Sequence, residues 1–217
     1  MILKIPTALL LFACLNAIAW PQTRDAGEQV SAYTSIELRP WLSIALPSNW
    51  QVQSEGMTGT VAAAMEAHGV DVTATLQSFS ANLILPEIRQ SPARMNVRFY
   101  PDPEKPSNDQ VELLGSHDVE YFDSQLRTGT EEGIQRIGGR ITEWYGSELV
   151  QIDGRFFIVT SYQRDLTSNP GGDVSNVFLH RYWDAERSFT LTTACQVNFC
   201  SIGQPILYHI QNSIDID

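Results

Sequence analysis

The 217-residue sequence predicts a single α+β domain, an antiparallel sheet with helices packed against it. Short runs that alternate apolar and polar residues fill positions 141–196, and stretches with helical periodicity lie on either side of them. Hydrophobic residues make up 43% of the chain and charged residues 18%, which is typical of a chain that folds. The length corresponds to about one domain.

Residues 1–19 have the pattern of a secretory signal peptide. One cation, Lys4, precedes an apolar run, and Ala17 and Ala19 form an A-x-A cleavage site before Trp20. The apolar run is shorter than the roughly 20 residues that a bilayer-spanning helix needs. We therefore expect an exported, periplasmic protein with no transmembrane helix.

A second processing site lies within the same segment. Residues 11–14, Leu-Phe-Ala-Cys, resemble a bacterial lipoprotein box, in which the cysteine becomes the lipidated first residue of the mature protein. Phe12 departs from the small residue that is usual at its position. A membrane-anchored lipoprotein, lipidated at Cys14, is thus the alternative to a soluble periplasmic protein.

The first half of the chain mixes strands with one short helix. Residues 20–40 are polar and are expected to form an N-terminal lead-in, so that the α+β domain spans 41–217. Residues 41–46 alternate as a strand does, and Pro-Ser-Asn ends it before Trp50. The sequence further predicts a helix at 58–68 and either a strand or a continuation of that helix at 70–76. Strands are expected at 79–85 and 96–100, and a proline-rich loop at 101–108.

A helix is predicted at 117–127, because Val119, Phe122 and Leu126 are spaced three and four residues apart. Ser116 or Asp118 would cap its N-terminus. The apolar stripe indicates that this helix packs one face against a sheet.

The C-terminal half predicts a four-strand antiparallel meander. Strand-like runs at 141–151 and 155–164 flank Asp153-Gly154, a strong hairpin signal, and further runs follow at 174–183 and 188–196. Pro205 is expected to open a closing helix, since proline favours the first helical turn. This helix would turn four apolar side chains toward the core: Ile206, Leu207, Ile210 and Ile214.

Removal of residues 1–19 leaves two cysteines, Cys195 and Cys200. In an oxidising compartment we expect a disulfide between them, which closes a small loop and contributes about 2 kcal/mol on the chain-entropy relation. Two free buried thiols, or a redox or metal role, are the alternatives.

The net charge of the chain indicates which classes of macromolecule it can bind. Fourteen Lys and Arg residues oppose 25 Asp and Glu residues, which gives a net charge of −11. Such a chain repels phosphate backbones, so nucleic acid is excluded as a partner and a basic protein is favoured.

Motifs of common enzymes are absent from the sequence. It contains no G-x-x-x-x-G-K-[ST], no H-E-x-x-H and no G-x-S-x-G. We therefore expect no catalytic, cofactor-binding or metal-binding residues. Of the four histidines, His180 is interpreted as a structural residue, either packed or solvent-facing, and the His117-Asp118 pair as part of a helix cap.

Aromatic residues are concentrated in the meander, often in adjacent pairs such as Trp144-Tyr145 and Phe156-Phe157. Adjacent residues of a strand point to opposite faces. Either half of these rings form an exposed surface for protein recognition, or helices cover the second face.

The order of elements resembles the PsbP-like fold of periplasmic and secretion-associated binding proteins. The likeness is carried by residues 46–50 (LPSNW), 80–85 (SANLIL), the Asp153-Gly154 hairpin, 189–193 (FTLTT) and the ending from Ile206 to Ile214. The resemblance implies a scaffold for protein interactions rather than catalysis, and it assigns no specific site to this chain.

These observations together predict an exported, non-enzymatic protein-binding protein of the bacterial envelope, in the manner of an immunity or secretion-associated factor. One alternative is a periplasmic hydrolase whose Ser, His and Asp residues come together only in the fold. Another is a lipid-anchored envelope assembly factor.

Overall fold

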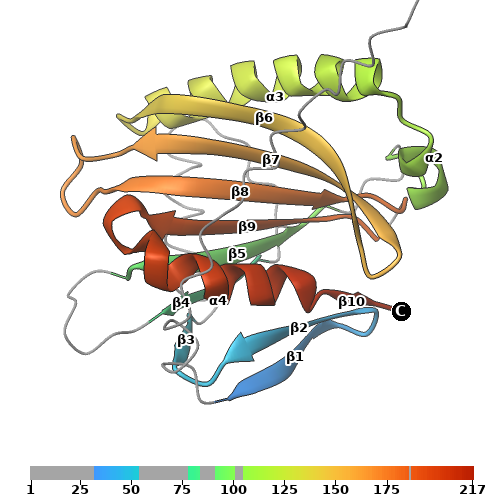
Figure 1. Ribbon diagram of the computed structural model, residues 1–217, viewed down its shortest axis with the longest axis horizontal. Helices are drawn as coiled ribbons and strands as arrows, with labels where there is room; N and C mark the ends of the chain where they lie inside the picture. The colour runs from blue at the N-terminus through green and yellow to red at the C-terminus, as the bar shows by residue number, and fades with distance from the viewer. Residues whose placement is uncertain (1–31, 54–77, 84–90, 101–104, 186) are drawn as a thin grey trace, which may run out of the picture.

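A computed structural model describes residues 32–53, 78–83, 91–100, 105–185 and 187–217 (Figure 1). The predicted signal peptide, Cys14, the helix expected at 58–68 and the segment 70–76 lie outside the described residues. The rest is one mixed structure in which helices pack on antiparallel sheets, so the predicted α+β class is confirmed.

A seven-stranded antiparallel sheet forms most of the molecule (Figure 1). The predicted strands at 79–85 and 96–100 are present in it with slightly shifted bounds. In sheet order the strands are β3 (Trp50–Gln53), β4 (Ser78–Leu83), β5 (Ala93–Phe99), β9 (Phe189–Gln196), β8 (Val174–Tyr182), β7 (Arg155–Asp165) and β6 (Arg140–Ile152).

The predicted meander is confirmed, because β6, β7, β8 and β9 are neighbours in chain order. Between β6 and β7 the turn residues Asp153 and Gly154 have φ angles of 47° and 75°. Positive φ at both central residues is the requirement of the tight hairpin turn that Asp-Gly favours.

A second sheet of three strands corrects the expected lead-in. β1 (Tyr33–Arg39) pairs with β2 (Leu42–Pro47), and β2 pairs with the short β10 (Asp215–Ile216). Residues 33–39 are therefore a strand rather than a lead-in. Their alternation is weak, and they are held by pairing to β2 and by Ile36 and Leu38, which pack against the core.

The C-terminal helix α4 (Cys200–Asn212) lies between the two sheets, in contact with β9, β5 and β2 (Figure 1). Its inward side chains are those predicted: Ile206, Leu207, Ile210 and, just beyond the helix, Ile214, all at most 3% exposed. They join the main core with Phe157, Tyr182, Phe189 and Leu191.

The predicted start of this helix at Pro205 is wrong. A 3-10 turn η2 (Val197–Phe199) leads directly into α4 at Cys200, and Pro205 lies inside the helix. Packing of the first turn against β5 and β9 decides the start, because Gly203 lies directly against Ala93 and Cys195. The proline preference for a first turn is weaker than this contact.

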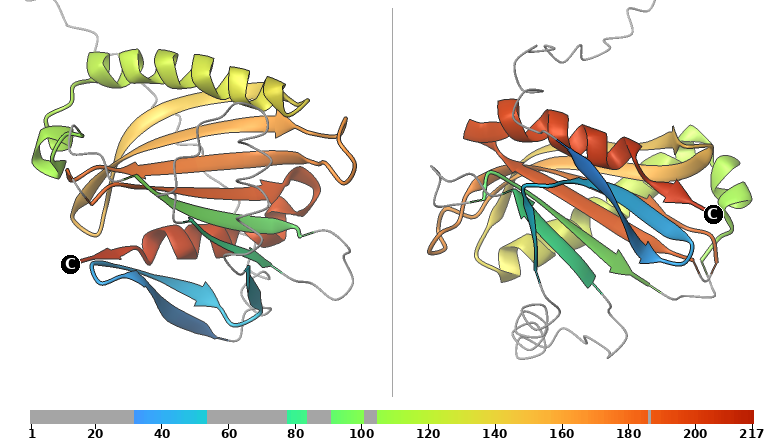
Figure 2. Two further views of the ribbon diagram at one scale, coloured as in Figure 1. Left: turned by 180° about the vertical axis from the view of Figure 1, so that it is seen from behind. Right: turned by 90° about the horizontal axis from the view of Figure 1, so that it is seen from below.

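Two further helices lie on the other face of the large sheet, on the side formed by β6 and β7 (Figure 2). α2 (Asn108–Glu112) is followed by α3 (Ser116–Arg136), which packs along β6 and extends nine residues beyond the predicted end. Asp118 accepts a hydrogen bond from the Gly115 N–H at 2.9 Å, which confirms its capping role. Of the helices that the structure describes, none has both the length and the apolar character that crossing a membrane requires.

Candidate functional site

The sheet face that carries α2 and α3 is divided into an apolar and a polar half. Under the helices, β6 and β7 contribute the apolar residues Leu149, Phe156 and Ile158. Phe122 of α3 packs on Trp183 at 5.0 Å between ring centres. On β4, β5 and β9 the residues that face the same side are polar: Ser80, Asn82, Arg94, Asn96, Arg98, Thr190 and Thr192. No described helix covers this polar half.

A recess of about 470 Å³ lies on the polar half, and we call it the arginine recess. Its floor is formed by β4, β5 and β9, and residues 171–173 between β7 and β8 form one wall. The charged residues that line it are Arg94, Arg98, Arg164 and Asp173, with Ser80, Asn82, Asn96, Thr192 and Gln196 among the polar ones.

The positive charges of this recess are only partly compensated. Arg94 pairs with Asp173 at 3.1 Å, and that carboxylate also accepts a hydrogen bond from the Ser175 hydroxyl. Burial, and then the neighbouring charge of Arg94, lowers the pKa of Arg164. Among the described residues, no carboxylate lies within ion-pair distance of Arg164 or Arg98.

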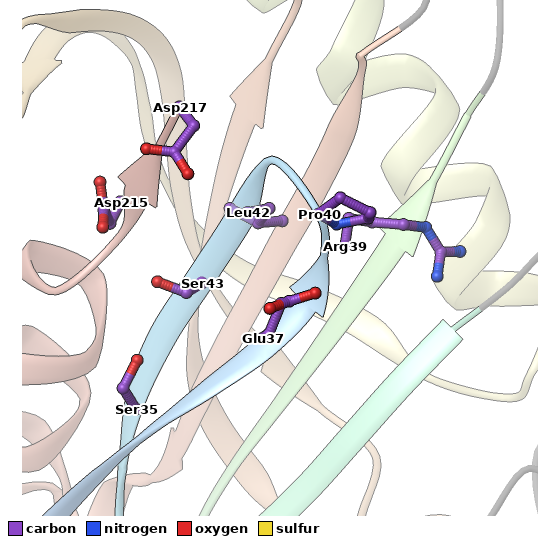
Figure 3. A pocket seen from close by; sticks show the side chains of 8 residues that line it. All are labelled: Ser35, Glu37, Arg39, Pro40, Leu42, Ser43, Asp215 and Asp217. Atoms are coloured by element: carbon purple, nitrogen blue, oxygen red, sulfur yellow. The ribbon is translucent and has the colours of Figure 1, made fainter.

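A second pocket, of about 350 Å³, lies on the small sheet and has the opposite charge. Ser43 on β2 is the register partner of Glu37 on β1 and also of Asp215 on β10, so the three side chains form one row across the sheet. Figure 3 shows the carboxylates of Glu37, Asp215 and Asp217 around Ser43. We call this the acidic pocket.

Arg39 lines the acidic pocket without neutralising it. Its guanidinium extends away from the carboxylates, as Figure 3 shows, and lies 4.1 Å from the centre of the Phe99 ring. Its Nη1 donates to the Leu38 carbonyl at 3.1 Å. Within the described parts of the chain, Glu37 and Asp215 have no cation at ion-pair distance.

The arrangement of both sheets is similar to that of cyanobacterial PsbP (CyanoP) from Synechocystis, with a TM-score of 0.52 over 87% of this chain and 94% of that chain. The domain has a PsbP-like fold. The identity of 10% limits this likeness to the fold. The resemblance inferred from the sequence is thus confirmed.

Two other solved structures are similar over most of the chain. LpqN of Mycobacterium tuberculosis, described as involved in cell envelope biogenesis, gives a TM-score of 0.43 at 9% identity, over 85% of this chain and 90% of that chain. A protein of Bacteroides thetaiotaomicron gives 0.40 at 9% identity, over 82% of this chain and 45% of that chain. No protein-family model matches the sequence, and no curated protein matches it.

In this PsbP-like domain Cys195 and Cys200 form a disulfide with an S–S distance of 2.09 Å. The bridge joins the end of β9 to the first residue of α4. Its setting is structural, since Cys195 and Cys200 belong to the main core.

The described histidines are not arranged as catalytic bases. His180 lies inside β8 and is 5% exposed, and its burial lowers its pKa to about 4. His117 is exposed on α3, and His209 packs against the Tyr33 ring at 3.8 Å between ring centres. None of these three donates a hydrogen bond to, or accepts one from, a carboxylate or hydroxyl of the described residues.

Of the two alternatives for the aromatic residues of the meander, coverage of the second face by helices holds for most of them. Phe157, Tyr182 and Phe189 are at most 1% exposed in the main core, while α2 and α3 cover Trp183 and Phe156 on the second face. Trp144 stacks on Tyr162 and donates to Asp123 of α3. Of the paired aromatics, Tyr145 is the one that stays largely exposed, at 51%.

Sequence reasoning did not find either pocket. Arg94, Asn96 and Arg98 alternate along one strand, and this spacing places polar groups on one face, a signal that was available. Glu37 and Asp215 come from opposite ends of the chain, and only the pairing of β1 and β10 with β2 brings them together. No local pattern predicts that pairing.

Proposed function

We propose that this protein is an exported, non-enzymatic protein-binding protein of the bacterial envelope, and that its partner places a basic side chain in the acidic pocket. The observation that carries the proposal is the row Glu37–Ser43–Asp215, whose two carboxylates have no cation at ion-pair distance among the described residues. Asp217 lies beside the row, and its main-chain oxygen accepts a hydrogen bond from Arg187 at 2.7 Å. An immunity or secretion-associated role is one form of this function.

The geometry of the row suits a lysine or an arginine. Residues directly opposite on neighbouring strands have Cβ atoms about 5 Å apart, so Glu37 and Asp215 stand about 10 Å apart on either side of Ser43. A cationic head group placed over Ser43 would reach both carboxylates, and the serine hydroxyl would accept one of its hydrogen bonds. A cation in this position would offset the repulsion between the Glu37 and Asp215 carboxylates, which the sheet holds in one row.

Three features support a binding role beyond the pocket itself. The net charge of −11 favours approach of a basic protein. Among the described histidines, His180 is buried, His117 is exposed and His209 packs against Tyr33, whereas a general base would hydrogen bond to the group that it activates. The PsbP-like resemblance implies an interaction scaffold, and the signal-peptide pattern of residues 1–19 supports export. Lipidation at Cys14 remains a prediction.

The test is capture of partners from envelope extracts by the wild type and by a double variant, Glu37→Gln with Asp215→Asn. The matched control is Glu112→Gln with Glu120→Gln, two exposed carboxylates of α2 and α3 that lie outside the pocket. Both doubles change the net charge from −11 to −9, so a difference between them reports position and not total charge.

The expected result is a protein, identified by mass spectrometry, whose retention on the pocket variant falls about threefold to tenfold, the loss of one or two partly exposed charge contacts. Retention on the control variant stays near wild type, and raised salt weakens binding to the wild type. Equal retention of every captured protein by the pocket variant and the control contradicts the proposal.

A further inference from the structure

The arginine recess holds three guanidinium groups that the acidic pocket does not involve. Arg94 and Arg98 lie four residues apart on one face of β5, with Asn96 between them. Arg164 comes from the end of β7, two residues along the sheet from the level of Arg94. The protein has only 14 Lys and Arg residues against 25 Asp and Glu residues, so a recess with three arginines and one lining carboxylate has a charge opposite to the whole.

Arg164 is the arginine of the recess that has a buried hydrogen-bond donor without an acceptor in the described part of the chain. Its Nε atom is buried and has no hydrogen-bond partner among the described residues. A buried charged donor without a partner is costly, because water is removed from it and nothing replaces the lost hydrogen bond. The nearby charge of Arg94 adds repulsion, which an anion between the two groups would relieve.

The recess already shows how it binds a carboxylate. Asp173 is 9% exposed and accepts a hydrogen bond from Arg94 Nη2 at 3.1 Å. One side of the Arg94 guanidinium is therefore already occupied by a carboxylate of the protein itself. Arg98 has no described ion-pair partner, and it faces the same side of the sheet as Thr192 and Ser80. The Ser80 hydroxyl accepts from Asn96 Nδ2 at 2.7 Å, which leaves its own proton for a ligand.

We propose that the arginine recess is a binding site for a small oxyanion ligand, a carboxylate or a phosphate, held by Arg164 and Arg94 beside Asp173. Planar guanidinium groups match the paired oxygens of both anions. The volume of about 470 Å³ lies within the range of small-molecule sites. This site is separate from the acidic pocket, so each can fail without the other.

The test measures binding of two defined probes, citrate and inorganic phosphate, by calorimetry and by the shift in melting temperature. Sodium chloride at matched ionic strength controls for screening. The variants are Arg94→Gln and Arg164→Gln, and the matched control is Arg127→Gln, an exposed arginine of α3 that pairs with Glu131 at 2.9 Å. All three remove one positive charge.

We expect at least one probe to bind the wild type and the Arg127→Gln variant, and to bind the Arg94→Gln and Arg164→Gln variants about tenfold more weakly or worse, the loss of one charge-assisted hydrogen bond. Citrate binding identifies the ligand as a carboxylate, and phosphate binding identifies it as a phosphate. If neither probe exceeds the chloride control, the proposal is overturned. Equal weakening in Arg127→Gln overturns it too. Because the Arg94 side chain is partly exposed, its variant keeps the test valid if Arg164→Gln fails to fold.

Discussion

Asn108 and Phe156 hydrogen bond to each other in both directions. The Asn108 Nδ2 donates to the Phe156 carbonyl at 2.9 Å, and the Phe156 N–H donates to the Asn108 Oδ1 at 3.0 Å. The same Nδ2 lies 3.3 Å from the Trp183 carbonyl. One buried side chain therefore completes backbone hydrogen bonding at the start of β7 and holds α2 on the sheet.

Replacement of this asparagine is expected to be costly. Asn108→Ala leaves buried backbone groups of Phe156 without partners, and we expect the free energy of unfolding to fall by about 2 to 3 kcal/mol. Urea unfolding measures the change. The matched control is Asp109→Ala, the exposed neighbour on the same helix, with an expected change of about 0.5 kcal/mol or less. Similar losses in the two variants would show that the paired hydrogen bonds do not carry the effect.

Gly203→Ala is expected to destabilise the protein although alanine favours helices. A Cβ atom at position 203 would lie 2.9 Å from the Ala93 Cβ and 3.3 Å from the Cys195 Cβ, so α4 must move away from β5. Overpacking of this kind costs about 1 to 3 kcal/mol, more than the helix preference of alanine returns.

Gly133 supplies the control for that substitution. It lies within α3 with no atom within 4 Å of the position that a Cβ would take. Gly133→Ala should therefore stabilise the protein by about 0.5 to 1 kcal/mol, the helix preference alone. Thermal and urea unfolding of both variants measure the two signs. A stabilising Gly203→Ala would disprove the close approach of α4 to β5.

Because His180 is buried, the protein is expected to lose stability in mild acid. Burial lowers its pKa from 6.5 to about 4, so between these values the unfolded chain binds a proton that the folded chain does not. The contribution of neutral His180 is complete above pH 6.5, declines as the pH falls, and reaches a loss of about 3 kcal/mol near pH 4.

A variant without the imidazole isolates this contribution. In His180→Leu the difference in unfolding free energy from wild type should shift by that amount, in favour of the variant, between pH 7.5 and pH 4. Substitution of Val177, a buried residue of the same strand without a titratable group, by alanine should leave the pH dependence of wild type unchanged. Parallel pH curves for wild type and His180→Leu would contradict the burial of His180.

Prediction from sequence worked where neighbours along the chain decide the structure. The Asp153-Gly154 turn, the four strands around it and the apolar side of α4 follow from local turn chemistry and periodicity. It failed where distant packing wins. β1 has weak alternation and depends on β2, and the first turn of α4 is placed by contact of Gly203 with β5 rather than by Pro205.

The candidate sites show the same division. The sequence alone determined the α+β class, the meander and the acidic net charge, because these depend on residue type and short-range spacing. Only the tertiary structure decided which charges meet. The order and register of the strands place Glu37 in line with Asp215 and bring Arg164 beside Arg94, because hydrogen bonding between strands joins residues at distances along the chain that no local pattern records.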